Sequence, residues 1–130
     1  MVVRGICCLR AGVPDETENI HIISIVGRYL EHSRIYIFGQ GERARYYIGS
    51  ADWMTRSTLR RVEIAAPVTA PALKARLQHI FDTMLADNCN ARVQQPDGSY
   101  VRRMPGADAV DCQAQFYEEA YQANVHSSLK

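Results

Sequence analysis

Residues 34–48 read RIYIFGQGERARYYI. Apolar and aromatic side chains fill residues 35–38 and predict a β-strand. The run Gly39-Gln40-Gly41-Glu42 is typical of a hairpin turn. Residues 43–48 predict the returning strand, because apolar and polar side chains alternate there and would point to opposite faces. A β-hairpin is therefore the element around which we expect the rest of the chain to fold.

Further strands and helices are predicted on both sides of this hairpin. Residues 50–60 read as a polar loop or irregular turn, and residues 20–30 as a strand followed by a short helix at 26–31. The other predictions are strands at 2–9 and 61–68, a small hairpin around Pro96-Asp97-Gly98, and helices at 69–87 and 111–124. This order predicts an α/β (α+β) fold in which a mixed β-sheet packs with helices.

Composition excludes several function classes. The chain has 130 residues, 47% of them hydrophobic and 22% charged, which is ordinary for one soluble globular domain. Its net charge of +1 gives no overall basic surface for nucleic acid or an anionic membrane. Any site for a polyanion must therefore be a local cluster of arginines.

The cysteines and the N-terminus bear on the cellular setting. The four cysteines form no C-x-x-C pair and are interpreted as small hydrophobes in a reducing compartment. No leader or membrane-spanning apolar run is recognisable, so the cytoplasm is expected. The chain begins directly in a strand-like run, which we interpret as a piece of a longer protein. A naturally short protein is the alternative.

Two segments carry groups suited to phosphate chemistry. Residues 25–34 place His32 between a glutamate and an arginine, and residues 49–56 combine a Gly-Ser turn with Asp52 and Arg56. Cations, hydroxyls, backbone N–H groups and an imidazole can hold and transfer a phosphoryl group. Imidazole exchanges protons near neutral pH, so His32 is the candidate acid–base. The alternative is a surface histidine with a structural hydrogen bond.

Arginines are the other candidate phosphate ligands, because a guanidinium binds phosphate through two hydrogen bonds. Arg4 is expected early in an apolar strand, where an unpaired charge is costly, so it needs a carboxylate or a bound anion. Ser50 can donate a hydroxyl hydrogen bond. For Trp53 the sequence favours local packing over a base-stacking platform. The arginines in or beside these segments are Arg4, Arg28, Arg34, Arg56, Arg60 and Arg61.

These motifs resemble a known family. The matching stretches are RGIC at 4–7, SIVGRYLEHSR at 24–34 and SADWMTR at 50–56, followed by RVE at 61–63. Together they resemble the last domain of bacterial polyphosphate kinase, a histidine-phosphorylated enzyme of the phospholipase D structural superfamily. The resemblance extends over residues 1 to about 122.

The resemblance implies a fold, an activity and roles for residues. Residues 1–125 would be the second phospholipase D-like catalytic domain and 126–130 a flexible tail. The family enzyme reversibly transfers the terminal phosphate of ATP to inorganic polyphosphate through a phosphohistidine in another domain. His32 matches its second catalytic-centre histidine, which contacts the nucleotide phosphates, and Arg4 matches an arginine that binds them. Ser50, Asp52 and Arg56 would shape the rest of the phosphate channel.

The same resemblance implies partners and leaves alternatives open. The implied substrates are ATP and ADP, while Mg²⁺ and the nucleotide base would be held by other domains. The full-length enzyme would be a homo-oligomer that does not bind nucleic acid. It would be cytoplasmic or associated with a membrane. Phospholipase D enzymes carry His-x-Lys-x-x-x-x-Asp, whereas Arg34 and Gly39 occupy the Lys and Asp positions here. Asp52 also replaces the usual asparagine. A homodimeric phosphodiesterase and a non-catalytic polyphosphate-binding module remain alternatives, and the isolated chain is expected to be inactive.

Overall fold

The computed structural model describes residues 1–5 and 7–128, without the side chains of residues 126–128. Ile6, in the predicted strand 2–9, and residues 129–130 of the predicted tail lie outside the described residues. The chain forms two compact units, which are described separately. The first unit comprises Met1–Glu31 and Thr83–Lys130, and the second comprises His32–Asp82.

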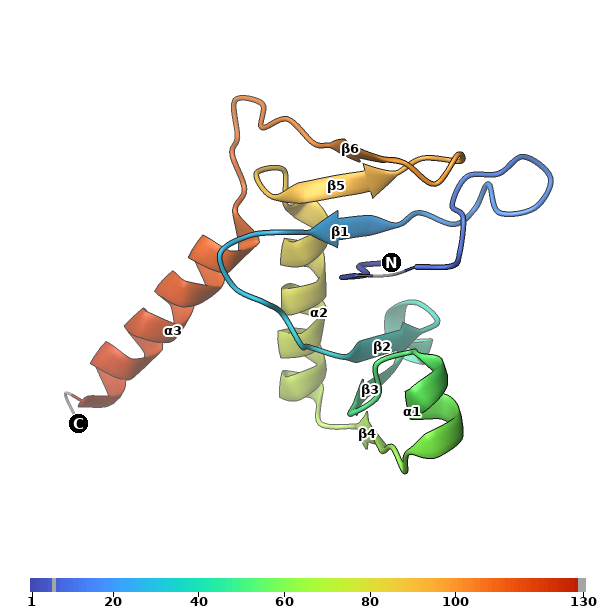
Figure 1. Ribbon diagram of the computed structural model, residues 1–130. Helices are drawn as coiled ribbons and strands as arrows, with labels where there is room; N and C mark the ends of the chain where they lie inside the picture. The colour runs from blue at the N-terminus through green and yellow to red at the C-terminus, as the bar shows by residue number, and fades with distance from the viewer. Residues whose placement is uncertain (6, 129–130) are drawn as a thin grey trace. The chain divides into compact units, whose positions relative to one another are not determined.

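Both units combine strands with helical segments (Figure 1). The first contains β1 (Ile23–Ile25), β5 (Ala91–Gln94), β6 (Tyr100–Arg102) and α3 (Cys112–Ser128). The second contains β2 (Ile35–Phe38), the 3-10 turn η1 (Gly41–Arg43), β3 (Arg45–Gly49), α1 (Thr55–Arg60) and β4 (Ala65–Val68). Helix α2 (Pro71–Ala86) crosses the boundary between the units. Proline at its first position suits a helix start, because the missing N–H has no partner there.

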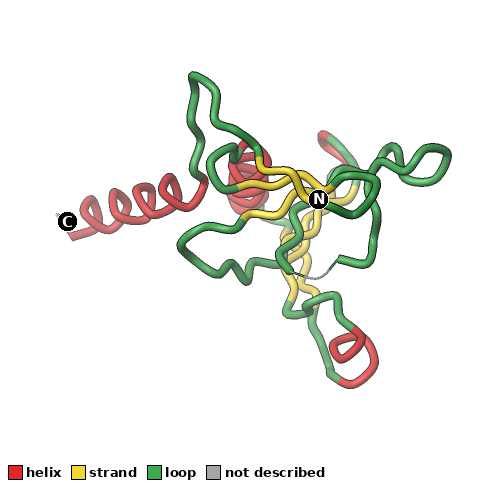
Figure 2. Tube along the Cα trace, turned by 45° about the horizontal axis from the view of Figure 1, so that its top comes forward, coloured by secondary structure: helices red, strands yellow, loops and turns green. Residues whose placement is uncertain are grey.

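The sheet of the first unit is antiparallel and has the order β1-β5-β6 (Figure 1), and Figure 2 shows the strands of the chain in yellow. Ile23 of β1 pairs with Val93 of β5, and Val93 pairs on its other side with Val101 of β6. The predicted hairpin around Pro96-Asp97-Gly98 is confirmed as the β5–β6 connection. Gly98 has a φ of +87°, a left-handed conformation that glycine adopts without strain.

A buried carboxylate joins three parts of the first unit. Asp87 is fully buried directly after α2. Its Oδ1 accepts hydrogen bonds from the backbone N–H groups of Asn90 (2.7 Å) and Ala91 (2.9 Å), and its Oδ2 accepts one from Cys112 (2.9 Å). The end of α2, the start of β5 and the first turn of α3 therefore share one side chain. Burial, together with this carboxylate, raises the pKa of the Cys112 thiol.

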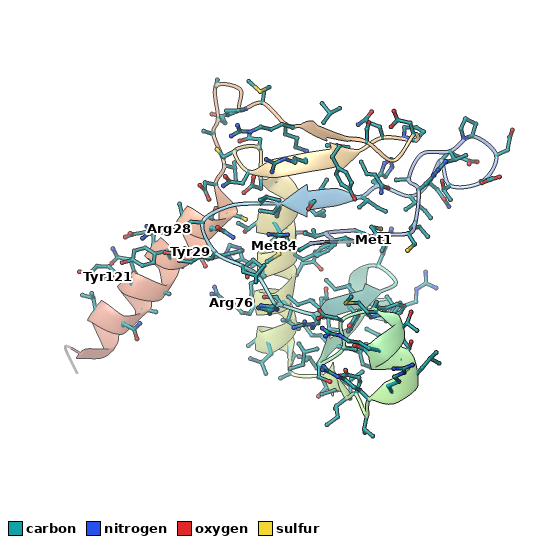
Figure 3. All side chains as sticks on the ribbon, viewed as in Figure 1. Met1, Arg28, Tyr29, Arg76, Met84 and Tyr121 are labelled. Carbon is teal, nitrogen blue, oxygen red and sulfur yellow. The ribbon has the colours of Figure 1, made fainter. Side chains whose placement is uncertain are left out.

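Helix α3 is fixed near its start by two side chains. Asp111 caps it, since its Oδ1 accepts hydrogen bonds from the N–H groups of Gln113 and Ala114. The buried amide of Gln113 holds Tyr29 through both backbone groups, accepting from its N–H (2.9 Å) and donating to its carbonyl (2.8 Å). Tyr29 lies beside α3, while Tyr121 projects from that helix further along (Figure 3).

The sheet of the second unit is also antiparallel, with the order β2-β3-β4. Ile35 pairs with Ile48, which confirms the hairpin expected in residues 34–48. The strand β3 packs on the N-terminal part of α2, because the Tyr46 hydroxyl donates to Gln78 (2.7 Å) and Lys74 lies over the Tyr46 ring. This unit buries few of its apolar side chains.

The predicted α+β class is confirmed, with differences in detail. The strands divide between two antiparallel sheets, and parallel pairing within the described residues is confined to a bridge between Val2 and Ile23. Apart from that bridge, the described part of residues 2–9 is not a strand, because its backbone forms no second β-bridge with a neighbouring segment. Residues 26–31 do not form the predicted helix, whereas α1 occupies part of the predicted loop 50–60. Helix α3 continues beyond the predicted end at residue 124.

Candidate functional site

An ion pair joins the two sequence segments that were predicted to carry the chemistry. The hairpin brings its two ends together, and the Gly49 N–H donates to the Arg34 carbonyl (3.1 Å). Just beyond these ends, the Arg34 guanidinium donates to Asp52 and to the carbonyl of His32. The hydrogen bond from Arg34 holds the pKa of the Asp52 carboxyl below its usual range, so this group is an anion at neutral pH.

His32 and Arg56 lie beside this ion pair. The charges of both contribute to the lowered pKa of Asp52, after the larger effect of Arg34. The Arg56 guanidinium is 4.0 Å from the second Asp52 oxygen, and its side chain is 56% exposed. The His32 side chain is exposed and makes no hydrogen bond within the described residues. The structure therefore brings His32, Asp52 and Arg56 together.

Ser50 is close by, but its hydroxyl is already engaged. Its Oγ donates to Glu63 and accepts a hydrogen bond from the Ile64 N–H (3.0 Å). The Ser50 N–H also donates to the Ile64 carbonyl (3.0 Å). Ser50 thus fastens the turn after β3 to the segment before β4, and a phosphate ligand would have to compete with Glu63 for its hydroxyl.

Gly49 is required by close packing at this turn. A Cβ atom at position 49 would lie 2.8 Å from Cε2 of Tyr36, closer than side chains approach one another. The Tyr36 hydroxyl donates to the Ala51 carbonyl (3.2 Å), so the ring covers the turn that carries Asp52. The sequence predicted that glycine permits a tight turn here, and the structure adds the ring that needs the space.

Arg4 differs from its prediction. It belongs to the first unit, whereas the other four candidate residues belong to the second. Its side chain is exposed, and residue 4 is not in a strand. Because its guanidinium remains in water, the expected cost of burying an unpaired charge does not arise.

The cluster in the second unit can hold an anion. Arg34 is only 20% exposed and is committed to Asp52, whereas Arg56 and His32 are accessible. Arginine binds phosphate oxygens through paired hydrogen bonds, and an exposed guanidinium 4.0 Å from a carboxylate can turn towards a more highly charged ligand.

The sequence reasoning missed two partners in this cluster. Arg34 was expected among the phosphate-binding arginines and not as the partner of Asp52, and Glu63 was considered only within a family match. The hairpin register was the available signal for Arg34, because pairing Ile35 with Ile48 places residue 34 beside the turn that carries Asp52. No signal of this kind pointed to Glu63, since the segment before β4 has no regular spacing.

Two further features concern the described residues only, a metal site and a membrane-spanning helix. Within residues 1–5 and 7–128, no group of three or more His, Cys, Asp or Glu side chains is arranged to hold a metal ion. In the same part of the chain, every helix is too short or too polar to cross a membrane.

Comparison with known proteins identifies the family. The fold defines an α+β protein, and its cluster presents an accessible arginine and histidine beside the Arg34–Asp52 ion pair. A family model described as "Polyphosphate kinase C-terminal domain 2" matches residues 1–115. The chain belongs to this polyphosphate kinase family, which confirms the resemblance found in the motifs.

The relatives are much longer than this chain. A polyphosphate kinase of Synechocystis is 55% identical over 107 residues, which is 82% of this chain and 15% of the relative. A polyphosphate kinase of Bacillus anthracis is 47% identical over 123 residues, which is 94% of this chain and 18% of the relative. The crystal structure of polyphosphate kinase from Porphyromonas gingivalis matches 92% of this chain with a TM-score of 0.83 and 34% identity. The chain spans 18% of that structure, less than a fifth of its length.

Proposed function

We propose that this chain supplies part of the phosphate-handling surface of a polyphosphate kinase, which transfers the terminal phosphate of ATP to polyphosphate. The observation that carries the proposal is the joining of His32, Asp52 and Arg56 at the end of the β2–β3 hairpin. Family membership supports the substrate class. The proposed substrates are ATP, ADP and inorganic polyphosphate, and the proposed setting is the cytoplasm.

In this proposal each residue has a separate task. Arg56 binds an oxygen of the transferring phosphate, because its guanidinium is accessible and only loosely held by Asp52. His32 donates or accepts a proton, or stabilises developing charge, since its imidazole is exposed and makes no hydrogen bond to the residues that the structure describes. Asp52 positions Arg34, and Ser50 and Glu63 fix the turn. Arg4 is proposed as a further phosphate ligand on the strength of the resemblance.

The decisive experiment uses the longer enzyme that carries this domain. His32→Ala should reduce polyphosphate synthesis from ATP by about 100-fold or more, the usual loss when a positioned acid–base is removed. His32→Gln serves as a matched control that keeps hydrogen bonding without proton transfer. Near-normal turnover in His32→Ala, with normal folding by circular dichroism, would contradict the role of His32.

The isolated chain allows a second test. We expect no turnover, since the phosphohistidine implied by the resemblance belongs to another domain. Polyphosphate should bind weakly by calorimetry, and Arg56→Gln should weaken it further, as should Arg4→Ala. Hydrolysis of a generic phosphodiester by the purified chain would instead favour the phosphodiesterase alternative. If neither arginine substitution changes the affinity for polyphosphate, Arg56 and Arg4 are not part of the proposed surface.

A further inference from the structure

The second unit contains a cavity that the proposed phosphate chemistry does not use. It lies beside the turn at Ala51 and has a volume of about 600 Å³, within the usual range for small-molecule sites. Four aromatic side chains contribute to its walls: Tyr36, Phe38, Tyr47 and Trp53. The remaining lining includes Ser57, Arg61, Glu63 and Ile64.

The aromatic walls are held in place by their own contacts. The Trp53 and Tyr36 rings have centroids 5.9 Å apart, and the indole N–H donates to the Tyr36 hydroxyl (2.9 Å). Phe38 and Tyr47 meet edge to face at 6.0 Å. Trp53 nevertheless remains 79% exposed and Phe38 59% exposed. The sequence favoured local packing for Trp53, but within this chain most of its surface is uncovered.

Polar groups with unused hydrogen-bonding capacity accompany these rings. Ser57 is only 3% exposed, yet its hydroxyl makes no hydrogen bond to the described residues. The Arg61 guanidinium likewise forms no ion pair or hydrogen bond within the described part of the chain. Glu63 accepts a hydrogen bond from Ser50 and keeps further acceptor capacity. The cavity therefore offers one free donor, one acceptor and one cation around aromatic walls.

We propose that this cavity binds the base of a nucleotide. A nucleobase is flat and stacks on aromatic side chains, and its edge needs both donors and acceptors. Ser57 and Glu63 supply these, and Arg61 offers a positive charge to the attached phosphates. A purely apolar peptide segment would leave the Ser57 hydroxyl and the Arg61 charge without partners. The site goes beyond the proposed function, for which the resemblance implies base contacts in other domains.

The cavity carries its own reporter, because Trp53 is the only tryptophan of the chain. The experiment titrates the purified chain with adenosine, ATP and inorganic tripolyphosphate while tryptophan emission is recorded. Adenosine and ATP should quench the emission saturably, with ATP binding more tightly. Tripolyphosphate can bind the phosphate cluster but should not quench. Quenching by tripolyphosphate equal to that by ATP, or no saturable response to adenosine, would overturn the proposal.

Matched variants separate stacking from charge. Phe38→Ala should weaken adenosine and ATP alike by roughly 10-fold to 100-fold, as expected when a stacking side chain is removed. Arg61→Gln should weaken ATP while leaving adenosine unchanged. Calorimetry with Trp53→Phe checks that the optical signal reports binding, and circular dichroism checks that each variant is folded.

The same experiment would also reveal a different occupant of this cavity. If the emission of the ligand-free chain shifts with protein concentration, and sedimentation shows a dimer, a second copy covers the aromatic rings and the proposal is overturned. The quenching test with adenosine can fail without affecting the proposed function. The proposed function is tested separately, by the loss of polyphosphate binding in Arg56→Gln.

Discussion

Removing the buried carboxylate of Asp87 tests how the first unit is held together. Asp87 is fully buried and accepts three backbone hydrogen bonds, from Asn90, Ala91 and Cys112. Asp87→Ala leaves these three N–H groups without their partner. Asp87→Asn keeps one acceptor oxygen, removes the charge and places an NH₂ group against at least one donor.

The size of the effect follows from these contacts. A hydrogen bond to a charged group contributes about 1.5–3 kcal/mol, although contributions within one network do not add fully. Three such bonds therefore give an expected loss of at least about 4 kcal/mol in the free energy of unfolding for Asp87→Ala. Domains of this size are stable by about 5–15 kcal/mol, so this loss could unfold the first unit. Asp87→Asn should lose roughly half as much.

Urea unfolding followed by two probes measures these losses. Far-UV circular dichroism reports α2 and α3, whereas Trp53 emission reports the second unit. Asp97→Ala is the matched control, because Asp97 is exposed and accepts a single backbone hydrogen bond from Ser99. If Asp87→Ala and Asp97→Ala shifted the dichroism midpoint equally, the reasoning about buried unsatisfied N–H groups would be refuted.

Three further perturbations have defined outcomes. Arg34→Gln should raise the pKa of Asp52 towards its ordinary value, measured by NMR titration. The ion pair lowers the pKa of Asp52 in the folded state, so it stabilises the fold above about pH 4 and loses this effect as the pH falls through that lowered pKa. The stability of Arg34→Gln should therefore change less with acid than that of the unmodified chain. An unchanged pKa of Asp52 in Arg34→Gln would contradict the ion pair. Gly49→Ala should cost about 1–3 kcal/mol and shift the Tyr36 ring resonances, since its Cβ would clash with that ring; unchanged resonances would contradict the clash. Gln113→Ala should cost about 1–3 kcal/mol and speed exchange of the amide it holds, and unchanged exchange would argue against that bond.

Much of the fold was predictable because its signals are local. The hairpin of residues 34–48 and the turn at Pro96-Asp97-Gly98 depend on neighbouring residues, and both are confirmed. The helix predicted over 69–87 is also present, as α2 over Pro71–Ala86. Residues 2–9 were mispredicted because an apolar run predicts burial but does not specify a pairing partner. Helix α1 was missed because its six residues are too few to show a helical period.

The structure brings three of the candidate residues together, but the contacts around them were harder to predict. His32, Asp52 and Arg56 meet because the hairpin joins their segments, which strand pairing implies. The hydrogen bond of Ser50 to Glu63 depends on the path of the chain before β4, which no spacing encodes. Arg4 was misjudged because the argument for a partner rested on burial in a strand that does not form.

The second unit is an uninterrupted segment inserted into a first unit made of two separate segments. Before β1 can pair with β5, the chain must close a loop of about 65 residues (26–90), with an entropic cost that short hairpins avoid. We therefore expect β2 and β3 to become protected early during refolding and the β1–β5 pairing to follow. Pulsed hydrogen exchange can follow this order directly, and protection of β5 before β3 would reverse it. Once the second unit has folded, its ends are held at fixed positions. This would lower the entropic cost of bringing the two segments of the first unit together.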